Sequence, residues 1–186
     1  LRDRSMTDEQ NPGQATPQPE GAAGAQLALQ KIYTKDVSFE IPNAPQVFQE
    51  QGQAEIKLNL AQKVEPLGED AEEIVLTITV TATIGEKTAY LAEVAQAGIF
   101  VISGFNEQQK HAIVNTFCPN TLFPYARTTI TTLVSDGGFP PLTLQPINFE
   151  QLYAQRMQQM SAEQGQAGNG ADVGEDTVAA AFKTND

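Results

Sequence analysis

The chain has 186 residues and a net charge of −12, with 23 acidic and 11 basic side chains. This length suits one ordinary domain, and the negative charge argues against nucleic acid or an anionic membrane surface as a partner. The lone cysteine favours a reducing compartment, and the longest apolar run, near residues 97–104, is too short to cross a bilayer. We therefore expect a soluble, cytoplasmic protein without a signal peptide or direct membrane insertion.

Composition divides the chain into one domain and two tails. Residues 1–25 and 161–186 hold few large apolar residues, so we expect a disordered N-terminal tail and a disordered acidic C-terminal tail. Residues 1–5 precede a Met that resembles a native start, and we interpret them as a cloning remnant. The folded domain is predicted at residues 26–160. Its own negative charge either maintains solubility or favours a basic partner.

The first strand, which follows residue 30, is predicted to have two unlike faces before a proline-flanked turn at residues 42–45 ends it. Side chains alternate along a strand, so one set can cover a core. That set is Tyr33, Val37, Phe39 and Ile41. The other set displays two carboxylates on an open surface and consists of Thr34, Asp36, Ser38 and Glu40.

Three more strands are predicted at residues 54–61, 73–84 and 87–96. In the segment 73–84 apolar residues alternate mainly with threonine, which is typical of an antiparallel strand with one covered side. Gly85 and Glu86 predict a tight hairpin to the strand that follows. The acidic run Glu69, Asp70, Glu72 and Glu73, which ends where the second of these strands begins, is interpreted as a solvated loop.

The second half of the domain has helical periodicity. A short helix is predicted at residues 106–117 and a longer one at about 120–135, because Pro124 is expected only in the first turn of a helix. Glycines after Asp136 supply the stop, residues 139–147 form an extended loop, and Asn148 caps a last helix. The predicted fold class is α+β, with helices packed on one face of the antiparallel sheet.

No catalytic or metal-binding apparatus is visible. His111 is the only histidine and Cys118 the only cysteine, so neither a structural zinc site nor a nucleophile with a convincing base can be assembled. We expect His111 to be a surface residue and Cys118 a small buried one. The sequence also lacks a phosphate-binding loop ending in Lys-Ser or Lys-Thr. No enzyme activity and no cofactor are expected.

Four segments resemble the SecB family of bacterial protein-export chaperones, in the order in which that family has them. They are Ile-Tyr-Thr-Lys-Asp-Val-Ser-Phe-Glu-Ile-Pro-Asn-Ala-Pro at 32–45, Ala-Gly-Ile-Phe at 97–100, Cys-Pro-Asn-Thr-Leu-Phe-Pro-Tyr-Ala-Arg at 118–127 and Gly-Phe-Pro-Pro-Leu-Thr-Leu-Gln-Pro-Ile-Asn-Phe at 138–149. The resemblance implies a four-stranded antiparallel sheet with two main C-terminal helices, and a homotetramer that is a dimer of dimers. It also implies an ATP-independent chaperone that holds unfolded precursor proteins and delivers them to the SecA translocation ATPase.

The resemblance also implies two sets of site residues. The SecA-binding set lies on the exposed sheet face and corresponds here to Asp36, Glu40, Leu91 and Glu93. The client-groove set is aromatic and aliphatic and corresponds to Tyr33, Phe48, Leu58, Tyr90, Leu142, Leu144 and Tyr153. The carboxylates could instead be ordinary solvated strand residues, and Leu58 and Leu144 could equally be core or subunit-interface residues.

The sequence departs from the family in the crossover loop, where residues 51–53 lack the expected tryptophan, and in the C-terminal tail, whose match is weak. A role of that tail in SecA binding therefore stays open. Two other functions also stay open. One is an adaptor that binds one dedicated partner through the same sheet without holding other proteins, and chaperones of the SecB type with a single client, such as an antitoxin, lie between this adaptor and the export chaperone. The other is a small-molecule enzyme or binding domain that uses the aromatic groove.

Overall fold

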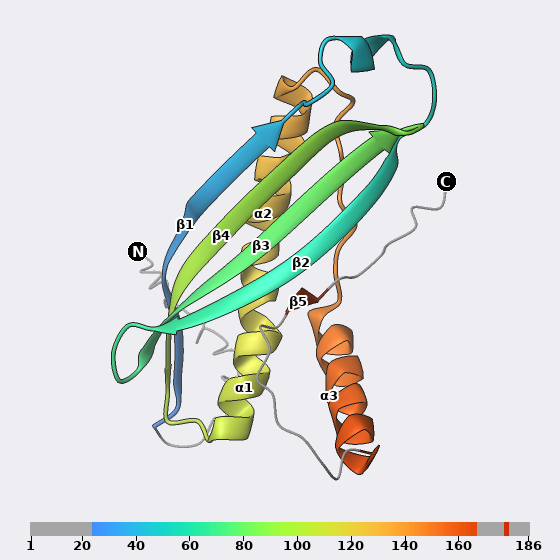
Figure 1. Cartoon of the computed structure of the whole chain (residues 1–186). Helices are drawn as coiled ribbons and strands as arrows, with labels where there is room; N and C mark the ends of the chain where they lie inside the picture. The colour runs from blue at the N-terminus through green and yellow to red at the C-terminus, as the bar shows by residue number, and fades with distance from the viewer. Residues whose placement is uncertain (1–23, 167–176, 179–186) are drawn as a thin grey trace, which may run out of the picture.

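A twisted antiparallel sheet forms one layer of the protein and α-helices form the other (Figure 1). The computed structural model describes residues 24–166 and 177–178. The helices of the described residues cover one face of the sheet only, which confirms the predicted α+β class. The expectations for residues 1–23, 167–176 and 179–186 lie outside the described residues. The domain boundaries at 26 and 160 stay predictions.

The sheet is built from β1 (Gln26–Glu40), β2 (Glu55–Pro66), β3 (Ala71–Ile84) and β4 (Lys87–Ser103). Their order is β1-β4-β3-β2, all neighbours are antiparallel, and a short strand β5 (Thr177–Val178) adds to the free side of β2. A crossover containing the 3₁₀ turn η1 (Gln46–Gln49) joins β1 to β2. Gly85 has a φ of 59° in the turn between β3 and β4, where glycine avoids the steric cost of a left-handed backbone, as the predicted hairpin requires.

The core lies between the sheet and the helices. Ile74, Ile78 and Val80 of β3 are fully buried, as is Val94 of β4, which lies opposite Ile78. Leu122 and the other inward residues of the long helix pack against this surface. The alternation predicted for residues 73–84 is therefore confirmed.

The predicted solvated loop is wrong at Glu72 and Glu73. Both residues belong to β3 and are buried, because β4 runs to Ser103 and pairs with the start of β3. A buried carboxylate requires a partner, and each has one. Glu72 lies 2.5 Å from Lys110 Nζ on the helix side, and Glu73 lies 2.5 Å from Lys35 Nζ on the opposite side.

The predicted faces of the first strand are wrong for Tyr33 and Thr34. Regular pairing between β1 and β4 is interrupted between Leu29 and Lys31 and again between Thr34 and Asp36, so the strand contains β-bulges. An extra residue shifts the phase of a strand relative to its partner. Tyr33 consequently lies on the same face as Asp36, Ser38 and Glu40, whereas Val37 and Phe39 face the helices.

The helices are α1 (Glu107–Asn115), α2 (Phe117–Asp136) and α3 (Phe149–Gln166). The predicted start of α2 is wrong, because the helix begins at Phe117 and Pro124 lies inside it. The proline of the first turn is Pro119, whose missing N–H costs nothing there. Pro124 is exposed, and the burial of Cys118, Pro119 and Leu122 on the sheet side supports these turns despite it.

The chain after α2 follows the prediction. The helix ends at Asp136, Gly138 has a φ of 84°, and the segment up to residue 147 is extended without regular structure. Asn148 Oδ1 accepts a hydrogen bond from the backbone N–H of Gln151 at 2.8 Å, which caps α3. Among the helices of residues 24–166, none is long and apolar enough to cross a bilayer.

Candidate binding surfaces

The sheet face without helices, here called the outer face, carries a patch of acidic side chains. In the register of β1 and β4, Ser38 is opposite Glu93, Glu40 is opposite Leu91, and Asp36 is opposite Ala95. Residues directly opposite in an antiparallel pair share a face. The structure therefore brings together all four residues of the predicted SecA-binding set, here called the acidic patch: Asp36, Glu40, Leu91 and Glu93.

Glu93 is the one carboxylate of this patch that a neighbouring strand orients. Its Oε2 accepts a hydrogen bond of 2.8 Å from Thr79 Oγ1 on β3. Asp36 and Glu40 are exposed, whereas Leu91 and Glu93 are half-buried. The patch thus combines two solvated charges with a charge and an apolar group held against the sheet.

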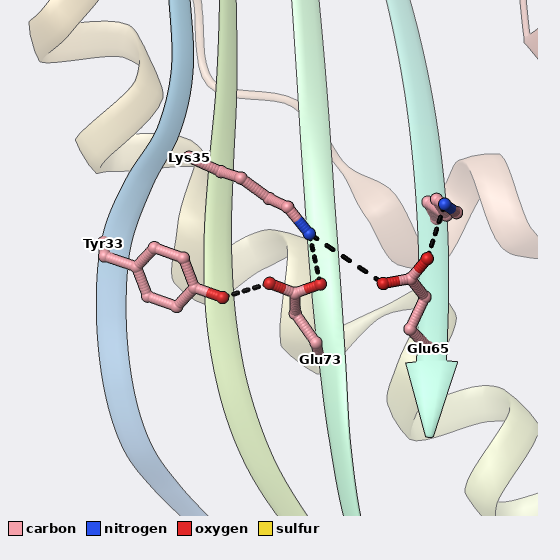
Figure 2. Close-up of polar contacts among 5 residues, drawn as sticks. Tyr33, Lys35, Glu65 and Glu73 are labelled. Atoms are coloured by element: carbon pink, nitrogen blue, oxygen red, sulfur yellow. Dashed lines mark hydrogen bonds and ion pairs between the residues drawn. The ribbon is translucent and has the colours of Figure 1, made fainter. Parts of the chain in front are cut away.

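A second cluster on the outer face joins three strands around Glu73 (Figure 2). Tyr33 of β1 donates a hydrogen bond to Oε1 of Glu73, and Lys35 Nζ lies 2.5 Å from Oε2. Lys35 Nζ also lies 3.9 Å from Glu65 of β2, whose other oxygen pairs with Lys63. Because Ala97 of β4 lies directly opposite Tyr33, its small side chain leaves room for long side chains to cross from β1 to β3.

The cluster fixes the charges of its members. The Lys35 ammonium and the Tyr33 hydroxyl lower the pKa of Glu73, since both hydrogen-bond to its charged form. The Glu73 carboxylate in turn raises the pKa of Tyr33 to about 12 and raises the pKa of Lys35. Glu73 is therefore an ionised, almost fully buried carboxylate that ties the bulged strand β1 to β3.

On the opposite side of the sheet, a groove of about 890 Å³ runs between β2 and the helices α1 and α3. Its apolar lining comes from all three elements and from β3: Leu60, Ala61, Val64, Leu76, Val114, Phe149, Leu152 and Tyr153. Polar and charged side chains line it as well, among them Lys110 and His111, and the Tyr153 hydroxyl lies 3.0 Å from His111 Nδ1. A mixed lining of this kind suits an extended peptide segment, with apolar side chains inside and the backbone near polar groups.

A separate aromatic cluster lies at the end of the sheet where β1 leads into the crossover. Phe139, after α2, packs on Tyr90 with ring centroids 4.9 Å apart and on Phe48 of the crossover at 5.2 Å. Phe39 stacks on Tyr90 at 5.8 Å. Phe48 is 50 % exposed, whereas Tyr90 is buried. The cluster therefore has a buried side at Tyr90 and a solvent-exposed apolar side at Phe48.

Comparison with known proteins now identifies the family. A family model described as "Preprotein translocase subunit SecB" matches residues 20–160. The chain belongs to the SecB family. The chain is 52 % identical over 158 residues to the protein-export protein SecB of Xanthomonas oryzae pv. oryzae strain MAFF 311018. The aligned residues cover 85 % of this chain and 92 % of that protein. It is 51 % identical over 167 residues to that of Stenotrophomonas maltophilia strain K279a, covering 90 % and 96 %.

A solved structure shares the fold. It is the Mycobacterium tuberculosis Rv1957 SecB-like chaperone in complex with a peptide from the HigA1 antitoxin. The TM-score is 0.53 at 19 % identity, and the match covers 66 % of this chain and 91 % of that one. The SecB fold is therefore present in the described residues.

The structure disperses the client-groove residues that the SecB resemblance implies. Tyr153 lines the groove, and Phe48 and Tyr90 belong to the aromatic cluster. Leu144 is buried in the core, while Leu58 and Leu142 are half-buried against it. Tyr33 lies on the outer face with Glu73. Their role in client binding stays a prediction.

Several residues that line the groove, notably Leu60, Phe149 and Leu152, are absent from the client-groove set predicted from the sequence. Their signal was present, because Phe149, Leu152, Tyr153 and Arg156 follow helical spacing and mark one side of α3. What the sequence lacked was the partner surface, since β2 and α3 meet only through the tertiary fold.

Proposed function

We propose that this protein is an ATP-independent cytoplasmic chaperone, not an enzyme, that holds precursor proteins unfolded for export and delivers them to SecA. Membership of the SecB family supports the chaperone class and the link to export. The observation that carries the proposal is the division of the sheet into two binding faces. The helix side offers the groove, with its apolar side chains, and the aromatic cluster, while the outer face offers the acidic patch.

Each face suits one of the two partners. Hydrophobic attraction is non-directional, so the apolar side chains of the groove can bind many unfolded sequences without selecting a particular one. A patch of charges instead favours a defined basic surface, because electrostatic complementarity gives specificity and orientation. A client can therefore occupy one face while SecA is recruited by the other.

The holding activity is tested with a slow-folding precursor mixed with the pure protein in the absence of ATP. We expect stoichiometric chaperone to block the return of the precursor's native fluorescence. The same precursor with an equal mass of serum albumin is the control for crowding. Unchanged refolding kinetics would refute the proposal, and capture of a single protein from cells in place of many precursors would favour a dedicated adaptor.

Delivery to SecA is tested by replacing Asp36, Glu40 and Glu93 with Asn, Gln and Gln. We expect SecA binding to fall at least about tenfold, since several charge-assisted contacts are removed together. A control variant that changes Glu69, Glu86 and Asp136 in the same way removes the same charge from exposed positions outside the patch. Equal SecA affinity in both variants would show that the acidic patch is not the docking surface.

We also propose that the chain assembles as a homotetramer, a dimer of dimers. Apolar side chains are exposed along the β1 edge and the adjoining part of α2, namely Leu29, Val37 and Tyr125. Such a strip at an open sheet edge is typical of an association surface. A solution mass near four times 20.1 kDa is expected by light scattering, and a stable monomer would contradict the assembly.

A further inference from the structure

The outer edge of β2 lies beside the groove. Within the described residues, β2 pairs with β3 from Glu55 to Pro66 on one side, and on its other side it pairs only with β5. An edge strand presents unpaired backbone donors and acceptors, which invite another extended segment. Among the described residues, β5 pairs with only Leu60 and Ala61 of this edge.

One stretch of β2, here called the window, has no charged side chain that would oppose the addition of another strand. Glu55 and Lys57 precede the window, Lys63 and Glu65 follow it, and residues 58–62 are uncharged. Charged side chains, especially lysines, are the usual protection of an edge against pairing. β5 pairs inside this window, with Val178 opposite Leu60 and Thr177 opposite Ala61.

The same two residues of β2 connect the edge to the groove. Leu60 and Ala61 line the groove that also contains Leu152 and Tyr153 of α3. Next to them, Asn59 Oδ1 is buried and has no hydrogen-bond partner among the described residues. The pairing with β5 leaves this oxygen without a partner, although a buried acceptor without a partner is costly. Figure 1 shows β5 beside the middle of β2.

We propose that the edge of β2 at Leu60–Ala61 is a strand-accepting site occupied by the chain's own strand β5 (Thr177–Val178), which an extended client segment must displace. The inference rests on the proposed chaperone function and adds a mode of client engagement to it. Backbone pairing supplies affinity that does not depend on the client's sequence, and the neighbouring groove takes alternate side chains. β5 then lowers the apparent client affinity by the fraction of chains whose site it fills.

Two variants test the site. One ends at Gln166, and the other is the full chain with Thr177→Pro and Val178→Pro, because proline removes the backbone donors that pairing needs. A full chain with Ala171→Pro and Asp172→Pro is the matched control. Hydrogen exchange is measured by mass spectrometry on peptides covering residues 58–62. Client affinity is measured with lactalbumin that has been reduced and alkylated with iodoacetamide, so that it cannot refold.

We expect faster exchange at residues 58–62 and about two- to tenfold tighter client binding in both test variants, with the control resembling the unmodified chain. Unchanged exchange would overturn the pairing, and unchanged client affinity would overturn the competition. If no chain binds the unfolded client, including the unmodified one, the proposed function fails instead. The exchange measurement still decides whether β5 occupies the edge of β2.

Discussion

Glu73 is the residue whose environment most constrains the outer face. It is almost fully buried, and its carboxylate is held by Tyr33 and Lys35 from a strand two places away in the sheet. A buried charge is tolerated only with such partners. The cluster therefore stabilises the sheet only while Glu73 is ionised.

Replacing Glu73 with Gln tests this dependence. Because its pKa is lowered in the folded protein, the carboxylate contributes stability above its unfolded pKa of about 4.3, and that contribution is lost as pH falls through the lower folded value. We expect Glu73→Gln to lower the free energy of unfolding by about 1–3 kcal/mol at pH 7 and by less at pH 3, which lies below the unfolded pKa. Urea unfolding at both pH values measures the difference. Glu69→Gln is the exposed control, and an equal loss at both pH values would contradict the assignment.

Cys118 gives a second residue-scale prediction. Its thiol is fully buried at the start of α2, and burial raises its pKa to about 12. Since the thiolate is the reacting species, we expect iodoacetamide at pH 8 to label the native protein far more slowly than the urea-unfolded protein. Mass spectrometry over time measures both rates. Rapid complete labelling of the native protein would show that this part of α2 opens readily.

Single residues are predictable from the sequence where the interaction that places them is local. The Gly85 turn, the stop after Asp136 and the Asn148 cap each depend on a few neighbouring residues, and all were predicted. Glu72 and Glu73 were assigned to a loop because their partners, Lys110 and Lys35, are far away in the sequence. The residues next to Glu72 and Glu73 in the sequence do not indicate an ion-pair partner that is so distant along the chain.

At the scale of elements, the contact between β4 and α2 depends on Gly98. A Cβ atom there would lie 2.6 Å from a ring carbon of Phe100 and 2.9 Å from a methyl of Leu122, both fully buried. We expect Gly98→Ala to lower the free energy of unfolding by about 1–3 kcal/mol, since neither side chain has space to move into. Thermal and urea unfolding measure the loss.

Gly68→Ala is the matched control for this substitution. It adds the same methyl group where nothing lies within 4 Å, in the turn before β3. It should leave stability nearly unchanged. Equal losses in the two variants would mean that the close approach of β4 to α2 does not decide the effect.

The sequence pattern predicts the faces and the ends of some elements better than those of others. β3 was predicted with its faces because its alternation is uninterrupted, whereas β1 was not, because bulges shift its phase without a marker in the sequence. The start of α2 was misplaced because Pro124 argues against a helix interior locally, and the burial of Cys118 and Leu122 outweighs it. The faces predicted for Asp36 and Glu40 of the acidic patch are correct, because both residues lie after the second bulge.

At the scale of the whole molecule, the sheet should keep its two binding faces energetically independent. Tyr153→Ala removes a groove residue on the helix side, and the acidic-patch variant changes only the outer face. We expect the first to weaken client binding about three- to tenfold with SecA binding unchanged, and the second to do the reverse. Titrations with an unfolded client and with SecA measure both. A loss of both affinities in either variant would show that the faces are coupled.

The bulge at Lys35 has a consequence for how the length of β1 can vary. Thr34 faces the helices and Asp36 faces outward, so deleting Lys35 would leave a strand of regular alternation with every other side chain on its present face. Deleting Ser38 would instead exchange the faces of all residues on one side of the gap. β1 should therefore tolerate a one-residue deletion at position 35, at the cost of the ion pair to Glu73, and reject one at position 38.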